Sequence, residues 1–153
     1  MKTLPDIRAL LPHQGTMVLL DRLVSVGEDT LCAEVDIHPA ALFCREGETG
    51  AWVGIEYMAQ AIAAYAGYSA WQRDEPVKIG FLLGTRRYEC TQPAFPSGST
   101  LQVHVQRVLQ ADNGLGAFEC HITEKATDIT VANATITVFQ PESINDFLHR
   151  SPE

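Results

Sequence analysis

The chain has 153 residues, of which 46% are hydrophobic, and a formal charge of −8 at pH 7. This size and composition are typical of one globular domain, residues 1–153, with a sizeable core. The negative charge argues against a nucleic-acid partner, whose phosphates require lysine and arginine. The N-terminal residues lack a signal-peptide pattern, and the four cysteines match no common zinc spacing. We therefore expect a cytoplasmic protein with reduced cysteines.

Two strands are expected before the first helix. Residues 17–26 (MVLLDRLVSV) are mostly apolar, and residues 31–37 (LCAEVDI) form a second apolar segment. A Gly-Glu-Asp sequence at 27–29 separates them and is typical of a turn. Residues 38–50 contain a proline and two glycines and are expected to form a loop.

Residues 51–71 (AWVGIEYMAQAIAAYAGYSAW) are expected to form a helix with a single charge, Glu56. A helix that is apolar on every side must be buried, so Glu56 and Gln60, one turn later, are expected in the core. A buried carboxylate costs free energy, so this one either serves chemistry or is held by hydrogen bonds in a structural role. The length also suits a bilayer, but the polar residues and the following strands favour no membrane insertion.

Beyond the helix the apolar period changes to two, as in strands. Residues 77–88 contain the run IGFLLG and are expected to form a central strand, and residues 92–99 a loop rich in proline and glycine. Residues 101–106 and 118–123 alternate between apolar and polar positions, which predicts two half-buried strands.

The sequence Asp-Asn-Gly at 112–114 predicts a hairpin turn between these two strands. His104 and His121 occupy polar positions of the alternation and are expected on the solvent face. A β-branched strand over residues 130–139 and a short helix over 142–150 complete the expected elements.

A long apolar helix and alternating strands together predict an α+β hotdog fold, in which a curved antiparallel sheet wraps around the central helix. The sheet would cover the helix, and each strand would keep one face in solvent. A single copy leaves sheet edges unpaired and part of the helix uncovered. We therefore expect a dimer.

Short motifs resemble those of the bacterial 3-hydroxyacyl-[acyl-carrier-protein] dehydratases, in the same order. Residues 11–13 (LPH) and 19–22 (LLDR) resemble their opening L-P-H-R-x-P-F-L-L-V-D-R. Residues 55–60 (IEYMAQ) resemble I-E-A-M-A-Q, residues 80–84 (GFLLG) the F-L-x-G strand, and residues 96–98 (PSG) the P-G-D turn. The whole chain is similar to a divergent dehydratase-like subgroup found with aryl-polyene biosynthesis genes.

The resemblance implies a site shared between two subunits. In the family a loop histidine removes the α-proton of the thioester, and a helix carboxylic acid protonates the leaving hydroxyl. The helix N-terminus polarises the thioester carbonyl. By resemblance Glu56 is the catalytic acid. An acyl tunnel along the helix would be lined by Gly50, Ala51, Tyr57, Gln60, Phe81, Leu82 and Gly84.

The family's histidine loop, G-H-F-P-G-x-P-V-M-P-G, is absent. Residues 40–52 read AALFCREGETGAW, and the position of the family histidine falls on Leu42 or near Cys44. His38, at the end of the second expected strand, is the candidate replacement base, although a structural role is the alternative. His13 belongs to the opening motif, for which the resemblance implies no catalytic role, and it is expected to cap a loop.

Three functions stay open on this sequence. The first is an active dehydratase that uses Glu56 with His38 or with a histidine of a partner chain. The second is a non-catalytic subunit paired with a complete dehydratase, and the third is a thioesterase in which Glu56 activates water.

The substrate would be a thioester of acyl carrier protein or coenzyme A, and the assembly a homodimer or a heterodimer with a homologous dehydratase. No metal or redox cofactor is expected, because the sequence has no ligand cluster, P-loop or dinucleotide motif. An acidic carrier could approach this acidic chain only at a local basic patch. Arg86 and Arg87 are the candidate pair, unless they only solvate the end of a strand.

Overall fold

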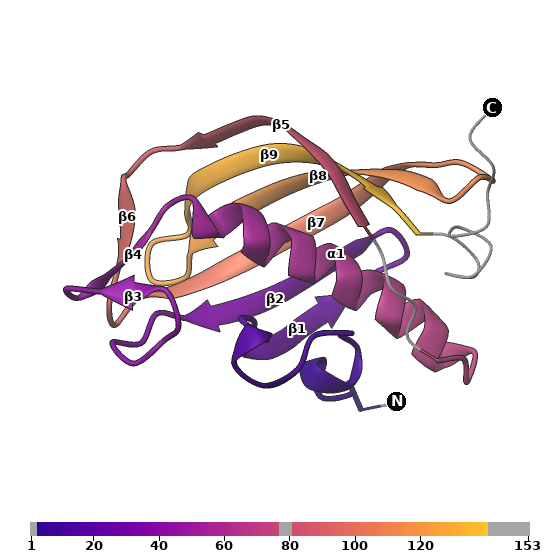
Figure 1. Cartoon of the computed structure of the whole chain (residues 1–153), viewed down its shortest axis with the longest axis horizontal. Helices are drawn as coiled ribbons and strands as arrows, with labels where there is room; N and C mark the ends of the chain where they lie inside the picture. The colour runs from indigo at the N-terminus through magenta and orange to yellow at the C-terminus, as the bar shows by residue number, and fades with distance from the viewer. Residues whose placement is uncertain (1–2, 77–80, 141–153) are drawn as a thin grey trace.

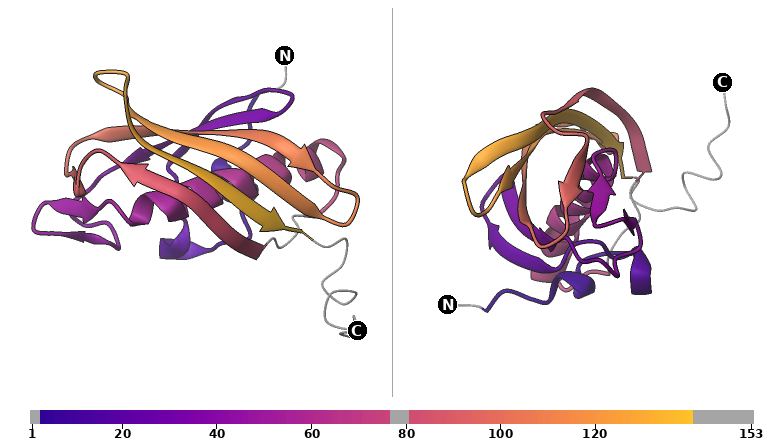
Figure 2. Two further views of the ribbon diagram at one scale, coloured as in Figure 1. Left: turned by 90° about the horizontal axis from the view of Figure 1, so that it is seen from above. Right: turned by 90° about the vertical axis from the view of Figure 1, so that its left-hand side faces the viewer.

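The computed structural model describes residues 3–76 and 81–140. One long helix, α1 (Val53–Gln72), lies along the inner face of a curved antiparallel sheet of six strands (Figures 1 and 2). This arrangement confirms the expected hotdog architecture. Within the described residues, no helix is long and apolar enough to cross a membrane. The helix expected at 142–150 lies outside these residues.

The six-stranded sheet has the order β1–β2–β7–β8–β9–β5, and neighbouring strands run antiparallel. The chain order of strand, strand, helix and then four further strands of this sheet matches the sequence analysis. Its members are β1 (Arg22–Val26), β2 (Thr30–Asp36), β5 (Phe81–Cys90), β7 (Thr100–Gln110), β8 (Leu115–Glu124) and β9 (Ile129–Phe139).

A second, three-stranded sheet lies beside the start of α1 and was not expected. It consists of β3 (Cys44–Arg45), β4 (Glu48–Gly50) and β6 (Ala94–Pro96). The sequence analysis placed loops over these residues. Strands of two or three residues are too short to display an alternating pattern, so the glycines and prolines dominated the interpretation.

The first expected strand begins later than predicted. Two short 3-10 turns, η1 (Ile7–Ala9) and η2 (Gly15–Met17), precede β1, which starts at Arg22. The apolar residues before β1 do not join the ladder, because the Met17 carbonyl and the Leu19 amide bond instead to the side chain of Gln60 on α1.

β5 lies at the edge of the sheet and not at its centre, and it pairs with β9. The expectation of a central strand was therefore wrong, and residues 77–80 of the expected segment lie outside the described residues. The apolar run suggested a strand covered on both faces of the sheet. Such a run does not reveal whether the strand has a neighbour on each side. At an edge, one row of backbone N–H and C=O groups is open to another chain.

The core forms between α1 and the inward side chains of the sheet. Leu101, Val103 and Val105 on β7 are buried, as are Phe118, Cys120 and Ile122 on β8, which confirms the alternation. The intervening histidines, His104 and His121, lie on the outer face with their rings stacked at 4.3 Å.

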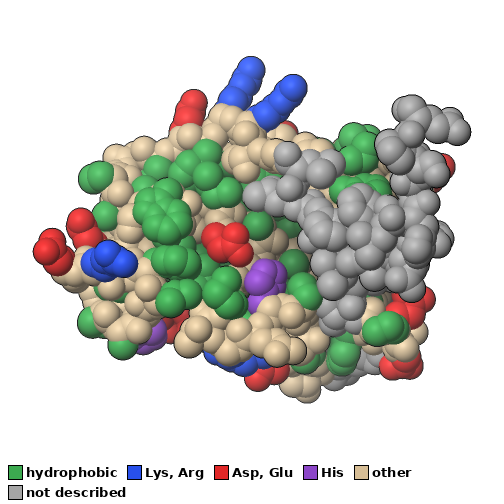
Figure 3. All heavy atoms as spheres, in the orientation of Figure 1, with side chains coloured by type: hydrophobic (Ala, Val, Ile, Leu, Met, Phe, Trp, Pro, Cys, Tyr) green, Lys and Arg blue, Asp and Glu red, His purple; other side chains and the backbone are tan. Residues whose placement is uncertain are grey.

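The other described residues do not cover the helix on all sides. Ala59, Ala63 and Ala66 follow Glu56 along one face and are only partly buried, whereas Met58 and Ala61 on the opposite face are fully buried. Figure 3 shows this side of the molecule, where a carboxylate and a histidine lie side by side among apolar side chains. We call this face of α1, formed by Glu56, Ala59, Ala63 and Ala66, the open stripe. A functional site on it can reach solvent.

Candidate active site

The start of α1 is held by the edge strand β5. The Tyr88 hydroxyl donates a hydrogen bond of 2.5 Å to the carbonyl of Ala51, just before the helix. Gly54 allows this approach, since a Cβ at that position would lie 2.3 Å from the Tyr88 oxygen. The unpaired amides of a helix N-terminus carry partial positive charge and favour a developing negative charge. The structure therefore fixes a polarising group beside the first turn of α1.

Glu56 lies in this first turn and faces the open stripe. Its side chain is 40% exposed, so the expectation that Glu56 lies in the core was wrong. The reason is that no other part of the described chain covers this face of the helix. The carboxylate can therefore meet a ligand directly.

His13 is the imidazole that the structure brings to Glu56. Its Nε2 lies 3.8 Å from Oε1 of Glu56, and its side chain is 27% exposed. Its Nδ1 is buried and has no hydrogen-bond partner among the described residues. The expected loop-capping bond is therefore not found in the part of the chain that the structure describes. The L-P-H motif singled out this histidine in the sequence. However, His13 and Glu56 are far apart in the chain, so nothing in the sequence placed the two side chains together.

Gln60 connects the segments that carry these two residues. It is fully buried, its Oε1 accepts from the Leu19 amide at 2.9 Å, and its Nε2 donates to the Met17 carbonyl at 2.7 Å. The same nitrogen lies 3.3 Å from Oε1 of Glu56. Gln60 was expected to bind substrate, but here its amide is engaged within the chain. It fixes the N-terminal segment, and with it His13, against the helix.

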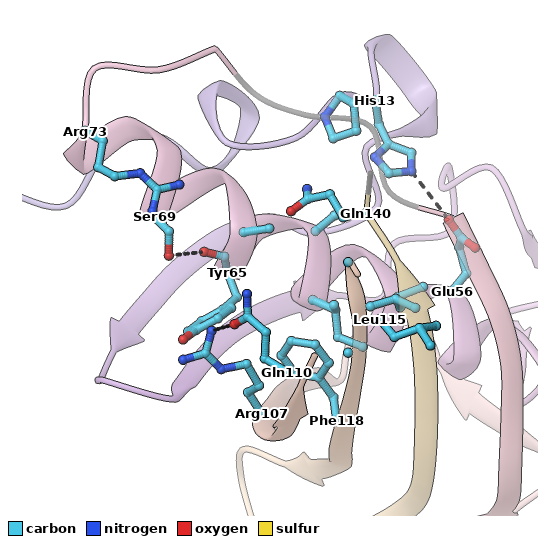
Figure 4. Close-up of a pocket in the computed structure, with 18 residues that line it drawn as sticks. His13, Glu56, Tyr65, Ser69, Arg73, Arg107, Gln110, Leu115, Phe118 and Gln140 are labelled. Atoms are coloured by element: carbon cyan, nitrogen blue, oxygen red, sulfur yellow. Dashed lines mark hydrogen bonds and ion pairs between the residues drawn. The ribbon is translucent and has the colours of Figure 1, made fainter. Parts of the chain in front are cut away.

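A pocket of about 310 Å³ extends from His13 and Glu56 along the open stripe of α1 (Figure 4). The helix forms one wall, and the β7–β8 hairpin and β9 form the other through Leu115, Phe118 and Val138. The catalytic candidates therefore sit at one end of a mainly apolar groove, which suits an acyl chain.

The opposite end of the pocket is polar. It is lined by Ser69 in the last turn of α1, by Arg73 just after the helix, and by Arg107 and Gln110 near the end of β7 (Figure 4). Arg107 is held in place by Asp29 at 2.8 Å and lies over the Tyr65 ring at 5.4 Å.

Of the other expected binding residues, Gly50, Ala51, Tyr57 and Gly84 are not among the described residues that line this pocket. Tyr57 is buried against Phe95, with ring centroids 6.3 Å apart, and burial raises the pKa of its hydroxyl. Gly50 ends β4 and Ala51 follows it, whereas Phe81, Leu82 and Gly84 belong to β5.

His38 is exposed just after β2 and lies beside Asp21 and Asp36, and it is not among the described residues of the pocket. The three side chains have potential metal-ligand atoms within 4.8 Å of one another. However, Arg22 binds both oxygens of Asp36 at 2.7 Å and holds the pKa of that carboxyl at about 2. The ion pair between Arg22 and Asp36 therefore organises this cluster. A catalytic role of His38 stays a prediction.

Comparison with known families gives a match over almost the whole chain. The model of the ApeP-like family, described as ApeP dehydratase, matches residues 5–149. A search of curated proteins found no match.

Solved structures give a consistent result. A chain of the dehydratase heterocomplex ApeI:P from Xenorhabdus doucetiae is 27% identical, with a TM-score of 0.87 over 97% of this chain and 100% of that chain. A hypothetical thioesterase from Streptococcus pneumoniae TIGR4, solved with coenzyme A, is 13% identical, with a TM-score of 0.59 over 78% of this chain and 84% of that chain. Escherichia coli PaaI is 14% identical, with a TM-score of 0.59 over 76% of this chain and 80% of that chain. The last two similarities concern the fold alone.

Proposed function

Because this chain belongs to the ApeP-like dehydratase family, we propose that it is a subunit of a dehydratase acting on 3-hydroxyacyl thioesters. The membership agrees with the resemblance found in the sequence. The single observation that supports a role in the chemistry is the Glu56–His13 pair, 3.8 Å apart at the end of an apolar pocket.

The reaction requires a base at the α-carbon of the thioester and an acid at the hydroxyl group on its β-carbon. The base takes the α-proton, the electrons of that C–H bond form the double bond, and the β-hydroxyl leaves as water after receiving a proton. Glu56 would deliver this proton. The N-terminus of α1 would stabilise the negative charge that develops on the carbonyl oxygen.

His13 is the base that the geometry supports best. An imidazole within a few ångströms of the acid can reach the α-carbon when the hydroxyl binds the carboxylic acid, and such distances tighten when substrate binds. His38, the base expected from the sequence, lies among carboxylates at the end of β2. A histidine of a partner chain is the third possibility, and the experiment below separates the three.

The open stripe of α1 and the free edge of β5 support an assembly of two chains. We propose a homologous dehydratase as the partner, because the similar chain from Xenorhabdus doucetiae occurs in a dehydratase heterocomplex. We further propose that the substrate is carried as a thioester on acyl carrier protein.

The test measures dehydration and hydrolysis of 3-hydroxyacyl thioesters, with the chain alone and together with a homologous dehydratase. Glu56→Gln, His13→Ala and His38→Ala are compared with the native chain at equal folded concentration. We expect Glu56→Gln and His13→Ala to reduce kcat by about 100-fold or more, and His38→Ala to leave it unchanged.

Each of the other outcomes has a clear meaning. Loss of activity in His38→Ala but not in His13→Ala would transfer the role of base to His38. Activity that needs the partner and survives both histidine changes would place the base on the partner chain. Release of free thiol without an enoyl product would replace dehydration by thioester hydrolysis.

A further inference from the structure

An arginine occupies a core-facing position of strand β7. Leu101, Val103 and Val105 point inward from this strand and are buried, and Arg107 is next in the same alternation. The residue directly opposite it on β8 is Phe118, which is also buried. A charged side chain on the inner face of a sheet costs free energy unless it is paired, so packing alone does not explain this arginine.

Three contacts hold the guanidinium group of Arg107 in one orientation. Its Nη2 lies 2.8 Å from Oδ1 of Asp29, and its Nη1 donates a hydrogen bond to Oε1 of Gln110. It also lies over the ring of Tyr65, which packs edge-on against Phe118 with ring centroids 5.8 Å apart. Within the described residues, the two hydrogen bonds use two of the five N–H donors of the arginine. A donor group that is already fixed loses less entropy when it binds a ligand.

Arg107 and Gln110 lie at the end of the pocket that is far from Glu56 (Figure 4). Ser69 lines the same end and comes thirteen residues after Glu56 on α1. A helix rises about 1.5 Å per residue, so the two positions are about 20 Å apart along its axis. A thioester bound at the first turn of α1 would extend its acyl chain along the apolar wall between them. Only a long acyl chain would bring its far end to Arg107.

The charges at this end of the pocket are balanced. Asp29 pairs with Arg107, and Glu75 lies 3.3 Å from Arg73, the other arginine of this end. An anionic end group would therefore meet little net positive charge. An uncharged oxygen can accept a hydrogen bond from Arg107 or Gln110, whereas a methyl group would separate these polar groups from water without replacing the hydrogen bonds that water makes.

We propose that Arg107 and Gln110 form a specificity subsite for a long acyl chain whose far end bears a hydroxyl group. This inference rests on the proposed function, which places the thioester beside Glu56. The subsite takes no part in the proton transfers. It selects substrates by the length of the acyl chain and by the group at its end.

The experiment compares 3-hydroxyacyl thioesters of acyl carrier protein whose far end is a methyl group, a hydroxyl group or a carboxylate. Each kind is prepared as a series of increasing chain length, and kcat/KM for dehydration is measured with the assembled dehydratase. The variants are Gln110→Leu, at an exposed side chain, and Arg107→Lys, which keeps the charge beside Asp29 but loses the planar group of donors. Arg45→Lys is the matched control at an exposed arginine that is not among the described residues of the pocket.

The native protein should prefer the hydroxyl end over the methyl end by about tenfold in kcat/KM, the effect of one hydrogen bond to a charged group. This preference should appear only at chain lengths that reach the subsite. Gln110→Leu and Arg107→Lys should each lose most of it and keep the native kcat/KM for short methyl-ended substrates, and Arg45→Lys should retain it.

The other outcomes separate this subsite from the proposed function. A hydroxyl preference that is absent at every chain length, or that survives in both variants, would overturn the subsite. A stronger preference for the carboxylate would overturn the choice of an uncharged end group. No turnover of any of these thioesters by the native assembly would instead refute the proposed function, on which the subsite rests.

Discussion

Replacing Gln60 by methionine tests whether this side chain fastens the N-terminal segment to the helix. Methionine keeps the unbranched, buried shape but removes the amide bonds to the Leu19 amide and the Met17 carbonyl, of 2.9 and 2.7 Å. Each lost bond that leaves a backbone group without a partner costs about 1–3 kcal/mol. The bond to the half-exposed Glu56 is longer, at 3.3 Å, and adds little. The variant should therefore lose about 2–6 kcal/mol of unfolding free energy, and its Tm should fall by about 4–24 °C.

Urea unfolding of the Gln60→Met variant and the native chain measures this loss directly, with Ser69→Ala as a control. Among the described residues the side chain of Ser69 bonds to the Tyr65 carbonyl one turn earlier, at 3.4 Å, so its loss should cost less than about 0.5 kcal/mol. If residues 17–19 loosen, His13 should also move away from Glu56, and kcat should fall in the folded variant. An unfolding free energy within about 0.5 kcal/mol of the native value would refute the reasoning.

Two further predictions concern the helix start and the ion pair near β2. Gly54→Ala should destabilise by about 1–3 kcal/mol, because its Cβ would lie 2.3 Å from the Tyr88 hydroxyl oxygen, and adding Tyr88→Phe should recover part of this loss in a double-mutant cycle. Additive losses would contradict this. Arg22 lowers the pKa of Asp36 from 3.8 to about 2, so Asp36 stabilises the fold above its unfolded pKa, and this contribution disappears as pH falls through about 2. Because Arg22 is half exposed and solvent screens the pair, the native chain should exceed Asp36→Asn in stability by only about 1 kcal/mol at neutral pH, as measured by urea unfolding, and a difference independent of pH would exclude this cause.

The sequence predicted the elements that have a strong period. The alternation around His104 and His121 and the composition of the helix determined the fold, because both patterns reflect burial directly. Edge position was not predictable in this way, since the apolar run of β5 looks the same at the centre and at the border of a sheet. The exposure of Glu56 was also missed, because composition does not reveal which face of a helix its own chain leaves open.

The candidate site depended on contacts between segments far apart in the chain. Glu56 was identified because one charge in an apolar helix is conspicuous. His13 was set aside because the resemblance implied no catalytic role for it, and its position beside Glu56 depends on Gln60, whose amide holds residues 17–19 against the helix. A glutamine in such a helix was a signal for a buried hydrogen-bond partner, but nothing in the sequence specified that the partner is the backbone after the L-P-H motif.

One partner chain could cover both the open stripe of α1 and the free edge of β5. A partner chain that pairs with β5 would approach the side on which Tyr88 holds the helix start, and it could cover the partly buried alanines beside Glu56. Covering them would exclude water from the Glu56–His13 pair, and electrostatic interactions strengthen when water is excluded. On this proposal the assembled protein shields the carboxylate that the single chain leaves exposed. On the proposed function, assembly completes the pocket and creates the environment in which the helix N-terminus and the carboxylic acid act most strongly.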